Sequence, residues 1–467
     1  MDNEKKGLNI STKSFITAIA VIFVLMCLTY ILTFIIPGGE YARTLDAAGN
    51  MVIDSEKGFR YVDGGISFVN WILSPILVLG ADGNAALIAI IAFLIVIGGI
   101  FNSLDRCGLM KYMLDRITNR FATNKYALLA IITFFFMALG AFIGSFEECV
   151  PLVPIVVALA IRLGWDALTG LGMSLLAVGC GFASGVCNPF TVGVAQELAG
   201  LPMFSGIWYR LVAFILIYGL LMVFLRFHVK KIEKISDEVQ INTDFVQSKP
   251  MDRGLICFGS LVGAGILLVL SSVFITVLQD YTMIIVAVVF LIAGIASVLI
   301  AGMSGKELFK TFASGAISIL PAVLMILMAN SIKYTLTEAN ILDTILHSIV
   351  SIAETLPRGV VILFIYLIVL IMNFFISSGS AKAFLLMPLI VPIAQLFDIS
   401  AQMCVMAFAF GDGFSNVFYP TNPVLLISLG LADVNYIKWA KWSWKFQAIN
   451  ILLTSGLLLI GLVIGYC

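Results

Sequence analysis

Charged residues are scarce in this chain and histidine is nearly absent. Lysine and arginine together number 27, aspartate and glutamate also number 27, and these charged residues make up 12% of 467 residues. A soluble globular chain has about 25% charged residues, so the composition excludes a soluble fold. The formal net charge is zero, which gives no support for a nucleic-acid partner.

The sequence also lacks the residue patterns that are typical of a metal site or of an enzyme with a nucleophile. The two histidines, His228 and His347, lie at the ends of apolar segments and have no metal-like partner. The eight cysteines show no paired CxxC spacing, and we expect buried thiols rather than a disulfide framework. We see no nucleophile–base pair either, so we expect a protein that is not an enzyme and has no cofactor.

Long apolar runs dominate what is present. Hydrophobic residues make up 61% of the chain and the mean hydropathy is +1.08, which predicts an all-α polytopic membrane protein. Because about 20 apolar residues span a bilayer, we expect continuous helices near 15–37, 84–103, 207–228, 254–278, 281–302, 311–332 and 444–465.

Lysine and arginine near the ends of these segments predict the orientation. The stretch 104–125 is rich in basic residues and should be cytoplasmic, as should the N-terminus, whereas 38–64 and 333–358 are weighted toward acids and should lie outside. We therefore expect a multi-pass protein of the bacterial cytoplasmic (inner) membrane. Under this topology the same order of segments occurs twice, with the second copy inverted, which is typical of secondary transporters.

The predicted domain organisation follows this inverted repeat, with two re-entrant helical hairpins and two broken helices. It consists of an N-terminal helix and external loop (1–83), a first repeat (84–228, with a hairpin at 126–163 and a broken helix at 167–199), a cytoplasmic linker (229–253), connecting helices (254–310), and a second repeat (311–467, with a hairpin at 359–397 and a broken helix at 399–431).

The first hairpin tip has the sequence Gly-Ser-Phe-Glu-Glu and includes Ser145, Glu147 and Glu148. A charge at the centre of a bilayer costs a few kcal/mol even on the gentler insertion scales (about 2.5–3.5 kcal/mol). Two adjacent glutamates therefore indicate a site that faces a cation. The alternative is that they hold the tip together through bonds to a buried base or to helix N-termini.

The second tip, Ser-Ser-Gly-Ser-Ala-Lys, contributes Ser378, Gly379, Ser380 and Lys382. Small residues let the backbone approach a ligand, and the exposed N–H groups at a helix start favour an anion such as a carboxylate. Lys382 takes the repeat position of Glu148, since 148 + 234 = 382. It can therefore pair with Glu148 or bind the carboxylate of a substrate, and the sequence leaves both open.

The broken segments place polar residues beside glycine and proline. Proline frees carbonyl groups in a helix, and unwound backbone at membrane depth is tolerated where it is packed in protein or lines a cavity. A packing kink is the alternative, but two such segments at matched positions favour a binding site. The candidate residues are Asn188 and Thr191 in the first segment and Asp412, Asn416, Thr421 and Asn422 in the second.

At these motifs the chain resembles the YfcC-type group of the ion transporter superfamily, which includes the ArcD-type basic amino acid antiporters. It is more distantly similar to the anaerobic C4-dicarboxylate carrier, AbgT and divalent-anion symporter families. The resemblance covers nearly the whole chain and is most specific at 144–154, 187–202, 377–392 and 411–423. It implies a mobile transport domain that moves against a scaffold domain, and a homodimer. The anion branches often carry Ser-Asn-Thr tips with Na⁺ sites, whereas the first tip here reads Ser-Phe-Glu-Glu.

Charge arithmetic then favours one substrate class. Glu147, Glu148 and Asp412 sum to −3 against +1 for Lys382. A dianionic substrate would meet net repulsion, whereas arginine, ornithine or lysine brings one carboxylate and two cationic groups. We therefore expect an exchanger of basic amino acids, with H⁺ or Na⁺ as a possible coupling ion and the metal question open. The alternative is a proton- or sodium-coupled symporter of C4-dicarboxylate-like carboxylates or of small peptides.

Overall fold

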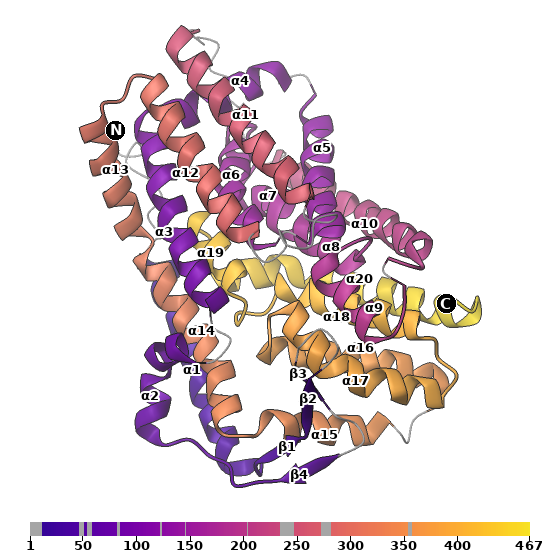
Figure 1. The fold of residues 1–467 in the computed structure, drawn as a ribbon. Helices are drawn as coiled ribbons and strands as arrows, with labels where there is room; N and C mark the ends of the chain where they lie inside the picture. Colours follow the sequence, from indigo (N-terminus) through magenta and orange to yellow (C-terminus); the bar gives the residue numbers. More distant parts are fainter. Residues whose placement is uncertain are drawn as a thin grey trace.

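The structure is a computed structural model that describes residues 12–45, 51–53, 58–81, 85–121, 124–144, 146–202, 204–233, 247–271, 282–353 and 357–467. Helices dominate these residues, as the composition predicts, and the helix order alternates between two groups of packed helices (Figure 1). Five of the described helices are long and apolar enough to cross a membrane: Lys125–Phe142, Ala167–Ser184, Ile207–Glu233, Gly379–Leu396 and Tyr436–Val463.

The first group collects helices from the N-terminal half and from the middle of the chain. Its members are α1 (Thr12–Ile35), α2 (Phe68–Leu77), α3 (Ala85–Arg106), α11 (Lys249–Ser271), α12 (Thr282–Ile300), α13 (Gly305–Ser318) and α14 (Leu320–Glu338). Within it, α12 packs against α11 and α3, α13 packs against α3, and α1 and α2 pack against α14. The resemblance implies a scaffold domain, and which helices form it remains a prediction.

The prediction of one continuous helix over 311–332 is wrong. The chain forms α13 up to Ser318 and starts α14 at Leu320, with Pro321 in the first turn of the new helix. Proline lacks the N–H that would continue the helical ladder, and its ring clashes with the carbonyl four residues earlier. Helix α2 was likewise absent from the expected set, because its ten residues are too few for a membrane span.

The second group contains the segments predicted to form the two hairpins and the two broken helices. Its members are α5 (Lys125–Ala138), α6 (Val153–Arg162), α7 (Ala167–Leu171), α8 (Ala177–Ser184), α9 (Val194–Leu198), α10 (Ile207–Glu233), α16 (Arg358–Phe375), α17 (Gly379–Leu396), α18 (Ala401–Asn416), α19 (Pro423–Leu431) and α20 (Tyr436–Val463). Irregular turns join some of them: π-helical at Leu139–Ile143, Gly172–Leu176 and Pro189–Gly193, and 3₁₀ at Glu147–Leu152; a further 3₁₀ turn, Val78–Gly80, follows α2.

Packing within the second group follows the same pattern in its two halves. Helix α5 packs on α8 as α16 packs on α18, α6 touches α19 as α17 touches α9, and α10 lies on α8 as α20 lies on α18. The helices α8 and α18 also contact each other directly. At their crossing a Cβ on Gly413 would lie 2.2 Å from the backbone N of Ala183. A shift of 230 residues matches the two broken segments, placing Gly181 on Gly411 and Thr191 on Thr421, and it also places Ala183 on Gly413. These two residues therefore meet where a pseudo-twofold axis requires equivalent residues to meet.

Two short amphipathic helices lie at opposite ends of the molecule, α4 (Leu109–Phe121) and α15 (Leu342–Ala353) (Figure 1). Two small antiparallel ribbons cover the α15 end, β1 (Gly39–Tyr41) with β4 (Phe59–Tyr61) and β2 (Arg43–Leu45) with β3 (Met51–Ile53). They are attached through Asp343, which accepts hydrogen bonds from Arg43 Nη2 at 2.8 and 2.9 Å and from the backbone N–H of Tyr41 at 2.9 Å. The predicted external loop therefore lies on α15, another segment predicted to lie outside.

Candidate functional site

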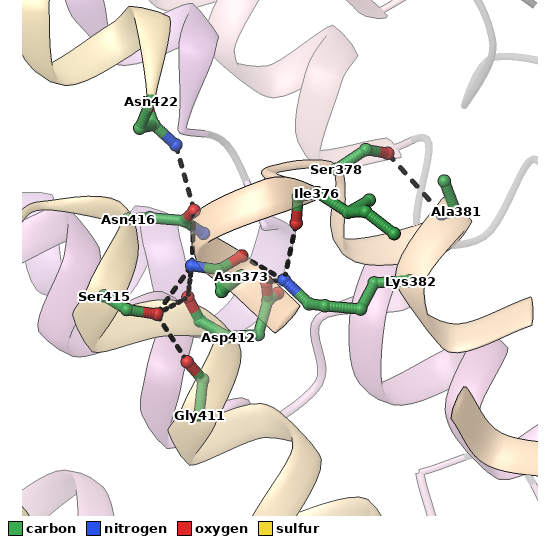
Figure 2. Close-up of polar contacts among 10 residues, drawn as sticks. All are labelled: Asn373, Ile376, Ser378, Ala381, Lys382, Gly411, Asp412, Ser415, Asn416 and Asn422. Carbon is green, nitrogen blue, oxygen red and sulfur yellow. Dashed lines mark hydrogen bonds and ion pairs between the residues drawn. The ribbon is translucent and has the colours of Figure 1, made fainter. Parts of the chain in front are cut away.

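The second hairpin tip buries a lysine. Helix α16 ends at Phe375, and α17 begins at Gly379 with Ser378 as its N-cap residue, which places Lys382 in the first turns of the new helix. The Lys382 side chain is fully buried. Its ammonium donates to Asp412 Oδ1 at 2.5 Å, to the carbonyl of Ile376 at 3.1 Å and to Asn373 Oδ1 (Figure 2). An ammonium has three donors, so protein oxygens satisfy all of them.

Asp412 reaches this tip from the second broken segment. It lies in α18 one turn before that helix ends at Asn416, and its side chain is fully buried. A cation near a helix N-terminus opposes the helix dipole, and a buried ion needs a partner in good geometry. Asp412 supplies both the opposite charge and a hydrogen bond. Lys382 therefore pairs with Asp412, a partner that was not predicted from the sequence. The Glu148 side chain lies outside the described residues, so the two roles expected for this lysine stay predictions.

An asparagine network joins the hairpin to the break. Asn373 Nδ2 donates to Ser415 Oγ at 2.6 Å, to Asn416 Oδ1 at 3.0 Å and to the Asp412 carbonyl at 3.1 Å (Figure 2). Asn416 Oδ1 also accepts from Asn422 Nδ2 at 2.9 Å. The other end of the Asn422 amide caps α19, because its Oδ1 accepts from the N–H groups of the first helical turn. The break between α18 and α19 is thus fixed on both sides.

The first broken segment meets the same tip. A Cβ at Gly379 would lie 2.4 Å from Thr191 Cγ2 and 2.8 Å from Asp412 Oδ2, so residues of both breaks touch this glycine. Glycine is needed here because any side chain would displace one of them. Gly144 makes the corresponding contact at the first tip. It has φ +78°, and a Cβ there would lie 2.2 Å from Oδ1 of Asn188 in the first broken segment.

Several buried polar atoms at this junction make no hydrogen bond with the described part of the chain. They are Asp412 Oδ2, Thr191 Oγ1 and Thr421 Oγ1. Buried polar atoms are nearly always satisfied in native structures, which makes these three oxygens candidates for contact with a ligand. Among the described residues there is no cluster of three or more histidines, cysteines or acids that could hold a metal ion.

In each half of the second group, the last helix (α10 or α20) donates a side-chain hydrogen bond to the backbone at the break. Arg210 Nε of α10 donates to the Val186 carbonyl at 3.4 Å, and Trp439 Nε1 of α20 donates to the Val417 carbonyl at 2.8 Å. Both carbonyls lie just past the end of a helix, where backbone acceptors have no partner in the helix. Fully buried Arg210 and Trp439 therefore support the two breaks in matching ways.

Most of the sequence-predicted residues come together in this region. Asn188, Thr191, Gly379, Lys382, Asp412, Asn416 and Asn422 are linked through the contacts above, and Thr421 lies in the second break. Ser378 is the cap of α17 and Ser380 is partly exposed. Ser145 lies outside the described residues, as do the side chains of Glu147 and Glu148, whose backbone starts the 3₁₀ turn Glu147–Leu152.

Three residues of the network were not among the predicted site residues. Asn373 and Ser415 lie at the centre of the hydrogen bonds, and Arg210 supports the first break. Asn373 and Arg210 each stand as a strongly polar residue inside an apolar helix. That signal could have identified both, because a buried polar side chain in such a helix needs partners within the protein.

The sequence relatives of this chain define its class, a multi-pass helical membrane transporter. Residues 15–463 match the sequence profile described as C4-dicarboxylate anaerobic carrier, and the chain therefore belongs to this family. It is 29% identical to YfcC of Escherichia coli K12, described as a candidate basic amino acid antiporter, over 81% of this chain and 78% of that protein. An uncharacterised Haemophilus influenzae protein is 24% identical over 98% of this chain and 99% of its own length.

Two solved structures resemble the fold at 15% sequence identity. One is the Alcanivorax borkumensis YdaH transporter, with a TM-score of 0.45 over 97% of this chain and 98% of that chain. The other is Neisseria gonorrhoeae MtrF, presented with a class of antimetabolite efflux pumps, with a TM-score of 0.46 over 95% of this chain and 94% of that chain.

Proposed function

We propose that this transporter exchanges basic amino acids such as arginine, ornithine and lysine across the cytoplasmic membrane by alternating access. The observation that carries the proposal is the saturated Lys382 ammonium, whose three donors all go to protein oxygens. Lys382 and Asp412 neutralise each other, so the four predicted site charges reduce to the two glutamates of the first tip. A site with this balance favours a ligand with net positive charge.

The second buried cation near a break leads to the same conclusion. Arg210 donates to the Val186 and Ser205 carbonyls, to Gln402 Oε1 at 3.4 Å and to the Tyr466 hydroxyl at 3.2 Å. Its donors are thus largely engaged by the protein. In this arrangement neither Lys382 nor Arg210 offers an open cationic group to a dicarboxylate.

In this proposal the substrate's cationic end lies toward Glu147 and Glu148 and its carboxylate toward the small residues of the second tip. Gly379 and Ser380 follow the cap residue Ser378 and begin the first turn of α17, where free backbone N–H groups and the helix dipole favour an anion. The unsatisfied oxygens of Thr191, Thr421 and Asp412 would bind substrate amine groups or a coupling H⁺ or Na⁺.

Uptake by proteoliposomes containing the purified protein tests the substrate class. We expect labelled arginine to enter vesicles preloaded with unlabelled ornithine, and labelled succinate not to enter under the same conditions. The variant Glu147→Gln keeps the volume of the side chain and removes its charge. It should weaken apparent arginine affinity by roughly 10- to 150-fold while leaving expression intact, because a charge-assisted contact contributes about 1.5–3 kcal/mol. Normal arginine uptake by Glu147→Gln would remove this residue from the site.

The second candidate is a proton- or sodium-coupled symporter of C4-dicarboxylates, which the description of the family favours. The same vesicles distinguish it. A symporter would accumulate labelled succinate in response to an imposed H⁺ or Na⁺ gradient, without any internal counter-substrate.

A further inference from the structure

A cavity of about 540 Å³ lies away from the hairpin tips, in the first group of helices. One wall is formed by Leu77, Val78, Gly80 and Ala81, at the end of α2 and in the turn that follows it, and the other wall by α14. This volume is in the range of small-molecule sites, about 300–1,000 Å³. None of the described residues that line it belongs to the tips or to the breaks.

The α14 wall is a polar stripe along the C-terminal half of a helix whose first half is apolar. Asn330, Lys333, Tyr334, Thr337 and Glu338 all line the cavity. Their spacing of i, i+3, i+4, i+7 and i+8 puts them on one face of the helix. A polar face on an apolar helix of a membrane protein indicates a water-filled or ligand-binding space, because such residues are costly against lipid.

Lys333 is the charged centre of this stripe. Its side chain is partly buried, and within the described part of the chain its ammonium has no hydrogen bond or ion pair. A partly desolvated ammonium is stabilised by an anion. Glu338 follows at the exposed end of the helix, and five residues of helical rise separate the two positions by about 7.5 Å along the axis.

We propose that this cavity is a second binding site for a small zwitterion, with the carboxylate on Lys333 and the cationic group toward Glu338. A basic amino acid fits because its extended side chain separates its charged ends by a comparable distance. Glu338 at the mouth would repel an anionic lipid headgroup, which favours a solute over a lipid. Helix α14 packs against α19, the helix that begins at the second break. The cavity is therefore one helix from the tip site, at the end of the molecule that carries α15.

This inference rests on the proposed function for the identity of the ligand, and one binding experiment separates the two. Labelled arginine is titrated by scintillation proximity onto the full-length protein in nanodiscs of neutral lipid. We expect two saturable sites per chain in the wild type. Lys333→Gln should weaken one site about ten-fold or more, the loss of one charge-assisted contact, and Lys333→Arg should largely restore it. Glu147→Gln should affect only the other site. Lys310→Gln, on the exposed face of α13, is the matched control and should leave both sites unchanged.

The outcomes are distinct. A single site that depends on Glu147 and not on Lys333 overturns the second site and leaves the proposed function standing. Binding that depends on Lys333 without any arginine transport supports the second site and refutes the exchanger. An absence of any arginine, ornithine or lysine binding refutes both. If adding phosphatidylglycerol to the nanodiscs displaces arginine from wild type but not from Lys333→Gln, a lipid headgroup is the occupant and the proposal is wrong.

Discussion

Lys382 and Asp412 form the buried ion pair on which the account of the site depends. Both side chains are fully buried, and the lysine lies near the start of a helix, where the dipole disfavours a positive charge. Removing one member of such a pair leaves a buried charge without a partner, which costs about 3–5 kcal/mol.

The single variants Lys382→Met and Asp412→Asn should therefore reduce the yield of monodisperse protein and lower its melting temperature in detergent. The double variant removes both charges and should recover most of the lost stability. Lys441→Met, at an exposed position of α20, controls for the substitution itself and should behave like wild type. Single variants as stable as the wild type would show that the pair does not form.

Asp166 gives a second test at the residue scale, outside the membrane-spanning segments. It caps α7 by accepting from the Thr169 backbone N–H at 2.9 Å, and His228 Nε2 lies 3.1 Å from the same oxygen. Burial raises the pKa of Asp166, but the hydrogen bonds from His228 and Thr169 outweigh burial and leave this pKa below its usual value.

A lowered folded-state pKa contributes stability that is present above the unfolded value of about 3.9 and lost as the pH falls through the folded value. The melting temperature of the wild type should therefore fall more steeply below about pH 4 than that of Asp166→Asn, which keeps the cap without the charge. The exposed Glu197→Gln variant should follow the wild type. Equal slopes in Asp166→Asn and wild type would contradict this role.

The partners of His228 show what the sequence could not predict about single residues. The chain suggested an interfacial histidine without a metal-like partner, and the structure places it between Asp166 and the Trp442 indole, which donates to Nδ1 at 3.1 Å. These partners are 62 and 214 residues away. No local pattern encodes such contacts, and the Lys382–Asp412 pair escaped prediction for the same reason.

The elements of the second group depend on glycines at helix crossings. A Cβ on Gly181 would lie 1.8 Å from the Met137 carbonyl oxygen, and one on Gly411 would lie 2.7 Å from Val369 Cβ. In each half the glycine lets the broken helix approach the first arm of its own hairpin. The shift of 230 residues that relates Gly181 to Gly411 thus also relates their packing roles.

Gly181→Ala should therefore be destabilised by about 1–3 kcal/mol or more, because overpacked cores lose this much and the obstacle is backbone. Gly411→Ala should be affected less, since it faces a side chain and backbone at longer range. Gly456→Ala in α20 has open space around its Cβ and should be neutral or slightly stabilised. Thermal unfolding of the three purified variants measures this order, and an unaffected Gly181→Ala would contradict the close approach of α5 and α8.

For the helices, the sequence predicted interruptions more accurately than it predicted continuous spans. Glycine, asparagine and proline in 179–191 and 411–423 indicated interruptions, and α8 ends at Ser184 while α18 ends at Asn416. The interruption at Ile319 was not predicted because the residues that follow it, 319–329, carry no polar side chain, and an apolar run satisfies the length rule for a span whether or not it bends. The strands β1 to β4 have three residues each, too few for an alternation of apolar and polar residues to be recognised in the sequence.

For the whole molecule, the predicted topology puts Lys111 in the cytoplasm and Asp343 outside. Helices α4 and α15, which carry these residues, lie at opposite ends of the structure (Figure 1). Asp343 is buried beneath Arg43 and is a poor labelling position. Ser348, exposed on the same helix, is better suited.

Lys111→Cys and Ser348→Cys should therefore react with a membrane-impermeant maleimide from opposite sides of the membrane, Ser348→Cys from outside in intact cells and Lys111→Cys only in inverted vesicles. Both are made with the exposed Cys467 replaced by serine, since the other seven cysteines are buried or partly buried. Reaction of both positions from one side would refute the inverted topology, and with it the orientation of the N-terminus.

Release of substrate from preloaded proteoliposomes tests the central claim, exchange of basic amino acids, most directly. Vesicles are loaded with labelled arginine, and its release is followed after adding arginine, ornithine, succinate or buffer outside. The account predicts rapid release with arginine or ornithine and slow release with succinate or buffer, because the site holds two glutamates against a lysine already neutralised by Asp412. Release driven by external succinate, or equal release into buffer alone, would contradict it.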